Sequence, residues 1–339
     1  MTRRLDPGLE ARRHLIEGYE EFPAIPAEVA QQWGAPFGPP EDWRLDIRDA
    51  TVPGRHGPVP IRIYTPHGPA PESGRACLVW MHGGAFAWGD LDMAEAHEVA
   101  RGVAGRADAV VVSVDYRLCP VPPELGGTID GRVDERGRPV RFPVPQDDCE
   151  AVLDAVRAAP GRFGVDPERV AVAGASAGAS LAASVTARAA RAGRPPWQTL
   201  LVYPLLHPEL PAPDAELADA LRAAPRALQF PAWMRAAIER TTWGDGEAAT
   251  PDSHPAIGTD LAAFPPTYIE NCEFDAFRSS GQLFAEQLRA VGVDVVEATR
   301  PGVPHGHLDL VGFQPAHDTL DALGARLRGD ARPAPLPGA

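Results

Sequence analysis

From residue 77 onward the chain repeats one pattern: a short, continuous run of apolar residues, then a stretch with helical periodicity. The runs read CLVWM, AVVVSVDY, RVAVAGA, TLLVYPL, PTYIENC and VDVVEAT. A strand that is covered on both faces has continuous rather than alternating apolar residues, and an intervening helix lets consecutive strands pair in parallel. The pattern therefore predicts the α/β class, with a mostly parallel central sheet flanked by helices.

The helical stretches carry Ala, Leu and Val at intervals of three and four residues. We expect helices at residues 91–105, 146–159, 177–192, 279–291 and 316–327. Ahead of the repeat, DWRLDIRDATV and VPIRIYTP alternate apolar and polar side chains on either side of PGRHGP. This alternation around a turn with Pro and Gly predicts a β-hairpin, which we expect to form antiparallel edge strands.

Three segments fall outside the repeat. PVPPELGGTIDGRVDERGRPVRFPVP, which follows Arg117 closely, is dense in Pro, Gly and charge, and this predicts a long surface loop. Residues 207–264 carry several aromatic residues on a mainly helical pattern, and an inserted helical segment over a parallel sheet can form a lid. The end of the chain, GDARPAPLPGA at 329–339, is typical of a disordered tail.

The stretch VAVAGASAGAS places Ser176 between Gly174 and Gly178 in the pattern G-x-S-x-G. The pattern lies where an apolar run ends and a helical stretch begins. A nucleophilic serine on such a turn adopts a strained backbone conformation, and only small neighbours let the strand and the helix approach each other. The context favours Ser176 as a nucleophile, with a tight structural turn as the alternative.

A serine is a weak nucleophile until a base removes its proton and a third group orients that base. In α/β-hydrolases the acid and then the histidine follow the serine along the chain. Asp275 comes directly after one apolar strand, in ENCEFDAFRSSG, and His305 comes after the next, in VPHGHLD. Because open α/β sheets build their sites at the carboxyl edge, we expect Ser176, Asp275 and His305 to meet there.

The stretch WMHGGAFAWGD follows the first apolar run of the repeat. Acyl transfer generates an oxyanion that needs backbone N–H donors, and glycine lets the backbone come close to it. Gly83 and Gly84 fit this role together with Ala177, the residue after the nucleophile. An ordinary glycine turn after a strand is the alternative for this stretch taken alone.

These motifs resemble those of the hormone-sensitive-lipase-like family of α/β-hydrolase carboxylesterases. The family pattern H-G-G-G-F is present as HGGAF, D-Y-R-L-A-P as DYRLCP, and the G-x-S-x-G pattern around the serine as GASAG. The D-L-x-x-L-P-P segment and its aspartate strand are similar to DLAAFPPTYIENCEFDAFR, and H-G-F is similar to PHGH. The resemblance covers most of the chain, with several motifs in the correct order.

The resemblance implies a serine carboxylesterase for short- to medium-chain esters, with a triad of Ser176, Asp275 and His305 and no cofactor. Gly83, Gly84 and Ala177 would supply the oxyanion donors. Activity should then fall as the pH drops through the pKa of His305, about 6 to 7 if weakly perturbed. The implied organisation is a cap of residues 1–42 and 207–264 over a core of residues 43–206 and 265–328, with the tail of residues 329–339.

Three residues depart from the family pattern. Ala85 stands at the third glycine, where its methyl group would narrow the site against bulky alcohols. Ser279 replaces a second acidic residue, and His307 places a polar ring where the family has Phe. These departures bear on the substrate more than on the mechanism.

Charge and composition exclude several function classes. The net charge of −14 repels phosphate backbones and anionic lipid, and no apolar run is long enough to span a membrane, so we expect neither nucleic-acid nor membrane binding. All 32 basic residues are arginines, which excludes Schiff-base, Ser-Lys and P-loop chemistry. The opening residues lack the apolar stretch of a secretory signal, and the four scattered cysteines read as reduced structural thiols. We therefore expect a cytoplasmic protein.

Other readings remain open at this point. HGHLD contains H-x-H-x-D, a spacing found in metallo-β-lactamase-like hydrolases, but Leu310 stands where such sites want a further histidine. Plant gibberellin receptors resemble this family and bind a small molecule without a catalytic histidine, whereas this chain keeps His305. Amidase, lactonase or deacetylase activity on a secondary metabolite would use the same triad. The oligomeric state, a homodimer included, is left open.

Overall fold

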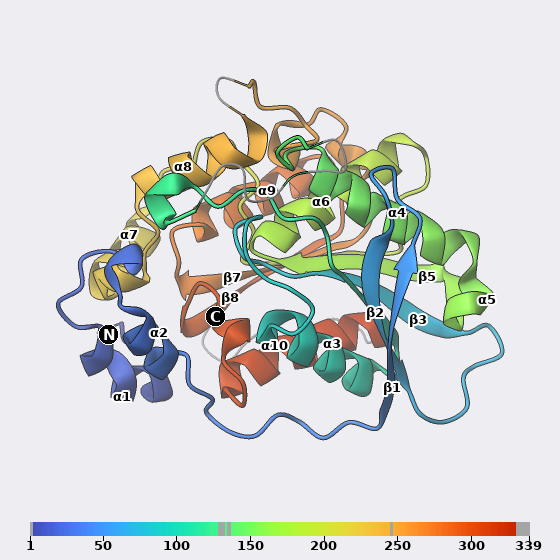
Figure 1. The fold of residues 1–339 in the computed structure, drawn as a ribbon, viewed down its shortest axis with the longest axis horizontal. Coiled ribbons are helices and arrows are strands. Elements are labelled where there is room, and N and C mark those ends of the chain that lie inside the picture. The colour runs from blue at the N-terminus through green and yellow to red at the C-terminus, as the bar shows by residue number, and fades with distance from the viewer. Residues whose placement is uncertain (1–2, 128–132, 134–136, 245–246, 330–339) are drawn as a thin grey trace.

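The protein is described by a computed structural model over residues 3–127, 133, 137–244 and 247–329. Eight strands form one sheet, and helices cover both of its faces (Figure 1). The strands are β1 (Leu45–Val52), β2 (Val59–Pro66), β3 (Arg75–Met81), β4 (Val110–Val114), β5 (Val165–Ala175), β6 (Thr199–Val202), β7 (Thr267–Phe274) and β8 (Val295–Pro304). The α-helices are α1 (Pro7–Ile16), α2 (Ala27–Trp33), α3 (Ala94–Ala107), α4 (Val144–Ala158), α5 (Pro160–Phe163), α6 (Ala177–Arg191), α7 (Ala215–Ala223), α8 (Ala232–Trp243), α9 (Arg278–Ala290) and α10 (Gln314–Arg328).

The strand order is β1-β2-β4-β3-β5-β6-β7-β8, and every pair from β4 to β8 is parallel. The predicted α/β class with a mostly parallel sheet is confirmed. The hairpin of β1 and β2 is also present. Of its two strands, β1 is at an edge of the sheet and β2 is not, because β2 also pairs antiparallel with β4. The sequence of β2 already departs from strict alternation, since Ile63 and Tyr64 are adjacent and both fully buried.

Two hydrophobic clusters cover opposite faces of the sheet. Alternate side chains of β3 divide between them: Val79 and Met81 lie in one cluster, Leu78 and Trp80 in the other. Helices α3 and α10 pack on one face and α4 and α6 on the other (Figure 1). This arrangement explains the continuous apolar runs, because neither face of the central strands meets water.

The five predicted helices are all present, as α3, α4, α6, α9 and α10. The largest shift is in α3, which we expected from residue 91 and which begins at Ala94. The side chain of Asp90 accepts hydrogen bonds from the N–H groups of Asp92 and Met93, at 2.9 and 3.0 Å, and so holds residues 90–93 in a turn. Such a local side-chain bond competes with the helix and delays its start.

The N-terminal helices and the inserted segment of residues 207–264 lie side by side (Figure 1). Arg226 forms an ion pair with Glu20 at 2.9 Å. The indole N–H of Trp233 donates to Glu21 at 3.0 Å. The predicted helical character of the inserted segment is confirmed by α7 and α8.

The described ends of the long loop after Arg117 contact the insertion and the first glycine-rich segment. Glu124 forms an ion pair with Arg240 of α8, and the N–H of Phe142 donates to the Thr242 carbonyl at 2.8 Å. The N–H of Cys119 donates to the carbonyl of Phe86 at 2.8 Å. Residues 128–132 and 134–136 of this loop, and residues 330–339 of the predicted tail, lie outside the described residues.

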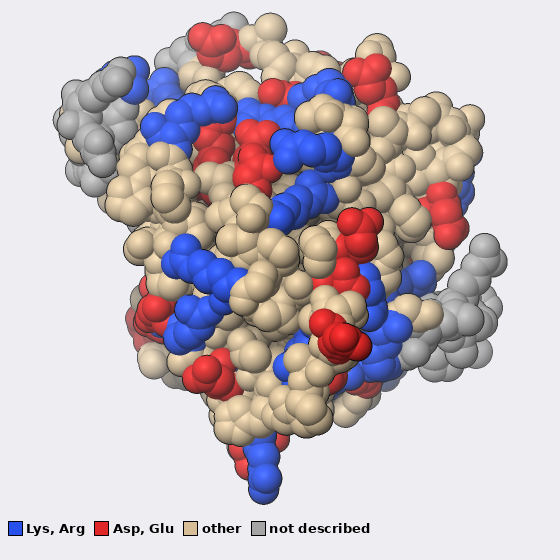
Figure 2. Space-filling model, turned by 90° about the vertical axis from the view of Figure 1, so that its right-hand side faces the viewer, with Lys and Arg blue, Asp and Glu red and all other residues tan. Residues whose placement is uncertain are grey.

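The distribution of charged side chains and the state of the cysteines agree with the expectations from composition. Arginine and acidic side chains are interspersed on the face that Figure 2 shows, rather than gathered by sign. All four cysteines are free and buried. Over the part of the chain that the structure describes, no helix has the length and apolar character needed to cross a membrane.

Candidate active site

Three of the predicted site residues directly follow the ends of parallel strands. Ser176 follows β5, Asp275 follows β7 and His305 follows β8. The loop with Gly83 and Gly84 follows β3. In the sheet, β5 lies between β3 and β6. The parallel sheet therefore brings segments that are up to 222 residues apart, from Gly83 to His305, to one edge.

The turn at Ser176 has the strained backbone that the motif predicts. Ser176 has φ +53° and ψ −120°, and its N–H donates to the Val202 carbonyl at 3.0 Å. A Cβ added to Gly178 would lie 2.5 Å from the carbonyl carbon of Met81, and one added to Gly174 would lie 2.7 Å from the Met81 carbonyl oxygen. Both glycines are therefore needed for the close approach of β3, β5 and α6.

The structure brings Ser176, His305 and Asp275 into one chain of hydrogen bonds. His305 Nε2 lies 2.8 Å from Ser176 Oγ, and His305 Nδ1 lies 2.6 Å from Asp275 Oδ2. The other carboxylate oxygen of Asp275 accepts the N–H of Phe277 at 2.9 Å. Both Asp275 oxygens are therefore bonded, so the carboxylate orients the imidazole ring.

His305 is surrounded by aromatic rings. The ring centroids of Tyr203, Phe277 and Phe230 lie 4.8, 5.1 and 5.2 Å from that of His305, whose side chain is only 7% exposed. Burial disfavours the charged imidazolium, but the negative charge and hydrogen bond of Asp275 outweigh this and raise the pKa of His305. The histidine is therefore arranged to accept a proton from Ser176.

The glycine-rich loop differs from the prediction at one donor. The N–H of Gly83 donates to Glu95 Oε1, a carboxylate in the first turn of α3, and is not free to bind an oxyanion. In the described part of the chain, the N–H groups of Gly84 and Ala85 have no acceptor. The amide of Ala177 opens α6, where the first N–H groups have no intrahelical partner and the helix dipole favours negative charge.

The loop after Gly83 has a rare backbone. Gly84, Ala85 and Phe86 have φ values of +106°, +50° and +62°. The hydroxyl of Tyr116 donates to the carbonyls of His82 and Gly83, at 2.8 and 3.2 Å. Left-handed conformations cost a non-glycine residue of the order of 1–2 kcal/mol each, so the loop is held by its surroundings rather than by its own preference.

His307 is fully buried, and its hydrogen-bond partners are not Ser176, Asp275 or His305. Its Nε2 lies 2.9 Å from Thr319 Oγ1 and its Nδ1 lies 3.4 Å from Cys272 Sγ. Burial lowers the pKa of His307 to about 4. His305 and His307 therefore have separate partners, and among the described residues no group of three His, Cys, Asp or Glu side chains could hold a metal ion.

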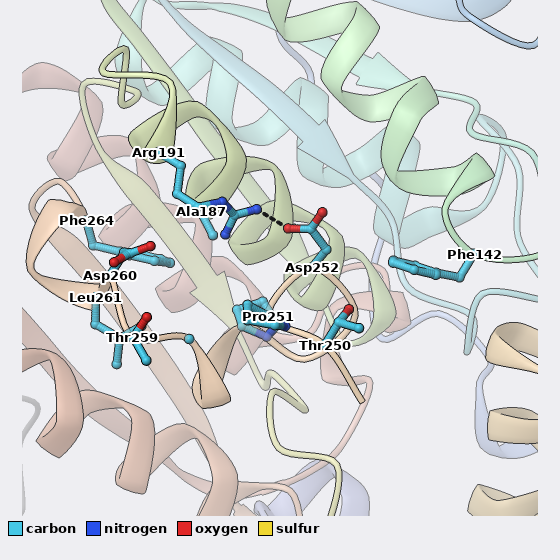
Figure 3. A pocket seen from close by; sticks show the side chains of 12 residues that line it. Phe142, Ala187, Arg191, Thr250, Pro251, Asp252, Thr259, Asp260, Leu261 and Phe264 are labelled. Atoms are coloured by element: carbon cyan, nitrogen blue, oxygen red, sulfur yellow. Dashed lines mark hydrogen bonds and ion pairs between the residues drawn. The ribbon is translucent and has the colours of Figure 1, made fainter. Parts of the chain in front are cut away.

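A separate surface pocket of about 420 Å³ lies between α6 and the segment that precedes β7 (Figure 3). Arg191 and Asp252, which form an ion pair, line it together with apolar residues such as Leu261 and Phe264. None of Ser176, Asp275 and His305 is among the residues that line this pocket. This pocket combines one ion pair with apolar residues and is separate from the arrangement of Ser176, His305 and Asp275.

The sequence analysis did not identify Glu95 and Tyr203, two buried residues that contact Gly83 and His305. Glu95 is 2% exposed and Tyr203 is fully buried. An acidic residue in the first turn of a helix is ordinarily read as a partner of the helix dipole. The available signal was the apolar surroundings of Glu95, since a buried carboxylate requires specific partners.

The comparisons with known proteins agree with this geometry. Residues 78–124 and 139–309 match a family with the alpha/beta hydrolase fold. The chain is 32% identical over 317 residues to the esterase LipI of Mycobacterium tuberculosis, covering 92% of this chain and 85% of that protein. It is 33% identical over 261 residues to the carboxylesterase NlhH of the same species, covering 76% and 74%. The solved structure of the esterase LipW from Mycobacterium marinum is similar with a TM-score of 0.72 and 30% identity, covering 97% of both chains.

Proposed function

The chain belongs to the hormone-sensitive-lipase-like family of α/β-hydrolase esterases, and on this premise we propose that it hydrolyses carboxylic esters with Ser176, His305 and Asp275 as its triad. One observation carries the assignment: the continuous hydrogen bonding from Ser176 Oγ through the imidazole of His305 to Asp275. A nucleophile, a base within reach and a group that orients the base are the requirements of nucleophilic acyl transfer.

In this proposal His305 Nε2 takes the proton of Ser176 as Oγ attacks the ester carbonyl. Asp275 accepts the Nδ1–H bond, fixes the tautomer and stabilises the imidazolium. The tetrahedral oxyanion accepts hydrogen bonds from the N–H groups of Gly84, Ala85 and Ala177. Ala85 is the donor here instead of Gly83, whose N–H donates to Glu95. His305 then protonates the leaving alcohol, and a water molecule activated by His305 hydrolyses the acyl-enzyme.

The substrate would be a small ester whose acyl or alcohol part is apolar. Support comes from the inserted segment, where Phe230 contacts both His305 and Phe277, and Trp243 contacts Phe86 of the glycine-rich loop with ring centroids 5.3 Å apart. We assign residues 1–42 and 207–264 to a cap over a core of residues 43–206 and 265–328. We place the protein in the cytoplasm, where its four buried free cysteines would stay reduced.

The test is hydrolysis of p-nitrophenyl acetate, butyrate, octanoate and palmitate by the purified protein and by two serine variants. Ser176→Ala should lower kcat by about 10⁴-fold or more. Ser180→Ala is the matched control, since Ser180 lies one helical turn away and its hydroxyl donates to the backbone carbonyls of Ser176 and Leu205. It should keep kcat within about tenfold.

The chain-length series measures the acyl site, and we expect the highest kcat/KM for acetate to octanoate. A fluorophosphonate probe should also label Ser176 stoichiometrically. A wild-type protein that hydrolyses none of the four esters and is not labelled at Ser176 would overturn the proposal.

A further inference from the structure

Glu95 is a buried carboxylate that the mechanism above does not use. It lies in the first turn of α3, and both of its oxygens accept hydrogen bonds. Oε1 accepts the N–H of Gly83, and Oε2 accepts the hydroxyl of Tyr203 at 2.5 Å. One side chain therefore connects the glycine-rich loop to the end of β6.

The bond to Gly83 fixes the direction of the next two amides. Gly83 immediately precedes Gly84 and Ala85, whose N–H groups are the oxyanion donors in the proposed function. A Cβ on Gly83 would lie 3.1 Å from Ser176 Cβ and would collide with Glu95 Oε1, so the loop is held tightly between the carboxylate and the nucleophile. A small displacement of Gly83 would therefore misalign both donors.

The bond to Tyr203 reaches the catalytic base. The Tyr203 ring packs on His305 with ring centroids 4.8 Å apart, and it also contacts the His307 ring at 5.4 Å. Tyr203 has φ +41°, a conformation that this residue type rarely adopts without outside support. Its hydroxyl bond to Glu95 and its N–H bond to the Glu270 carbonyl, at 2.6 Å, supply that support.

The backbone of Glu95 is held as well. Its N–H donates to Asp309 Oδ1 at 3.2 Å, and its carbonyl accepts the indole N–H of Trp80 at 2.9 Å. Asp309 belongs to the short helical turn that follows His305. Glu95 thus contacts three segments of the site: the glycine-rich loop, the end of β6 and the histidine loop.

We propose that Glu95 is a positioning residue for acyl transfer, which aims the amides of Gly84 and Ala85 through Gly83 and sets the ring of His305 through Tyr203. This inference rests on the proposed function. The carboxylate also acts on His305 through its charge, alongside the charges of Asp275 and Asp309, and all three favour the imidazolium. Tyr203 faces His305 as a buried phenol, whose pKa burial raises, and it stays neutral.

The experiment compares Glu95→Ala, Glu95→Gln and Tyr203→Phe with the wild type in steady-state hydrolysis of p-nitrophenyl butyrate. Glu95→Ala removes the anchor of Gly83, and kcat should fall about 100-fold with KM within threefold, as for loss of an oxyanion donor. Glu95→Gln keeps the anchor, because its amide oxygen accepts from Gly83 and its NH₂ donates to the Tyr203 oxygen. It should keep kcat within tenfold.

The pH profile separates positioning from a merely structural role. Burial raises the pKa of Glu95, while the hydrogen bonds from Tyr203 and Gly83 favour its charged form. Above that pKa the carboxylate favours protonated His305, so Glu95→Gln should move the acid limb of kcat/KM to lower pH. Tyr203→Phe keeps the Glu95 carboxylate but loses the hydrogen bond from the Tyr203 hydroxyl to it. It should lower kcat by about tenfold without moving the acid limb to lower pH. Glu98→Gln is the control on the same helix, since Glu98 bonds to Arg101 away from the site, and it should match the wild type.

Affinity for an alkyl trifluoromethyl ketone, whose adduct carries the oxyanion, should fall in Glu95→Ala by the same factor as kcat/KM. Thermal unfolding identifies any variant that fails to fold, and Glu95→Gln with Tyr203→Phe then carry the test. Glu95→Ala within threefold of the wild-type kcat, or an unmoved acid limb in Glu95→Gln, would overturn the inference. An inert wild type would instead refute the proposed function before any variant is compared.

Discussion

Replacing Gly178 by alanine tests the close packing that holds the serine turn. Gly178 lies in the first turn of α6, two residues after Ser176, and faces the end of β3. The added Cβ would lie 2.5 Å from the carbonyl carbon of Met81 and nearer still to the carbonyl oxygens of Met81 and His82. These are backbone atoms at the end of a buried inner strand, so no flexible side chain can move aside.

The loss in unfolding free energy follows from the distance by which α6 and β3 would have to separate. Carbon atoms in contact lie about 3.5–4.0 Å apart, so α6 and β3 would have to separate by about 1 Å. Both elements are buried along their length, and overpacking of a dense core costs about 1–3 kcal/mol where side chains can adjust. Because only backbone can move here, we expect Gly178→Ala to lower the free energy of unfolding by about 3 kcal/mol or more.

The measurement is urea unfolding followed by circular dichroism, with p-nitrophenyl butyrate hydrolysis on the same samples. Gly161→Ala is the matched control, because a Cβ at Gly161 of α5 meets nothing within 4 Å. It should leave activity unchanged and raise the free energy of unfolding by about 0.5–1 kcal/mol. A Gly178→Ala protein that unfolds within 1 kcal/mol of the wild type would show that strand and helix are not in this close contact.

Four further outcomes follow from the site. Asp275→Asn should lower kcat/KM by about 10⁴-fold in ester hydrolysis, because His305 loses the acceptor that fixes its tautomer; a loss below tenfold would contradict the assignment. The wild-type kcat/KM should fall as the pH drops through a His305 pKa that lies above its usual value of 6.5, since Asp275 favours the imidazolium and only the neutral ring is a base; an acid limb below pH 6 would contradict this. Ala85→Gly should raise the melting temperature by relieving the φ of +50° and raise kcat/KM for tertiary-alcohol esters relative to primary ones; unchanged ratios would show that the methyl group does not border the alcohol site. Phe230→Ala should raise KM for p-nitrophenyl octanoate more than for acetate, and equal effects would place Phe230 outside the acyl site.

The sequence predicted the parts of the site that are encoded locally. Ser176, Asp275 and His305 each follow an apolar run directly, and parallel strands with helical crossovers must bring those positions to one edge. The order of these residues along the chain was therefore enough to expect that they meet. The same local reasoning gave the α/β class and the five main helices.

The donor set of the glycine-rich loop could not be predicted in the same way. Gly83 and Glu95 are 12 residues apart. Their contact depends on how the glycine-rich loop packs against the start of α3 in the folded protein. The buried carboxylate of Glu95 accepts the N–H of Gly83. The N–H groups left for an oxyanion are therefore those of Gly84 and Ala85, one residue further along the chain than expected. The sequence shows both residues but not the distance between them.

The buried partners of His307 were hidden for a similar reason. The polar ring in place of Phe was visible, but its partner Thr319 lies on α10, and Thr319 in turn donates to Glu270, which pairs with Arg300 at 2.6 Å. Each of these residues alone resembles a surface residue of its element. Their pairing in the interior depends on the joint packing of α10, β7 and β8, which no local pattern encodes.

The contacts between the N-terminal helices and the inserted segment have a consequence during synthesis. Glu20 and Arg226 are 206 residues apart in the chain, and Glu21 and Trp233 are 212 apart. At about 5–20 residues per second, α1 and α2 leave the ribosome some 10–40 s before their partners exist. The N-terminal segment must therefore wait for these partners, and Phe22 for its ring contact with Phe230 at 5.4 Å between centroids, while β3, β5 and α6 form the turn at Ser176. On this view the turn at Ser176 forms early, and the contacts between the N-terminal helices and the inserted segment form late.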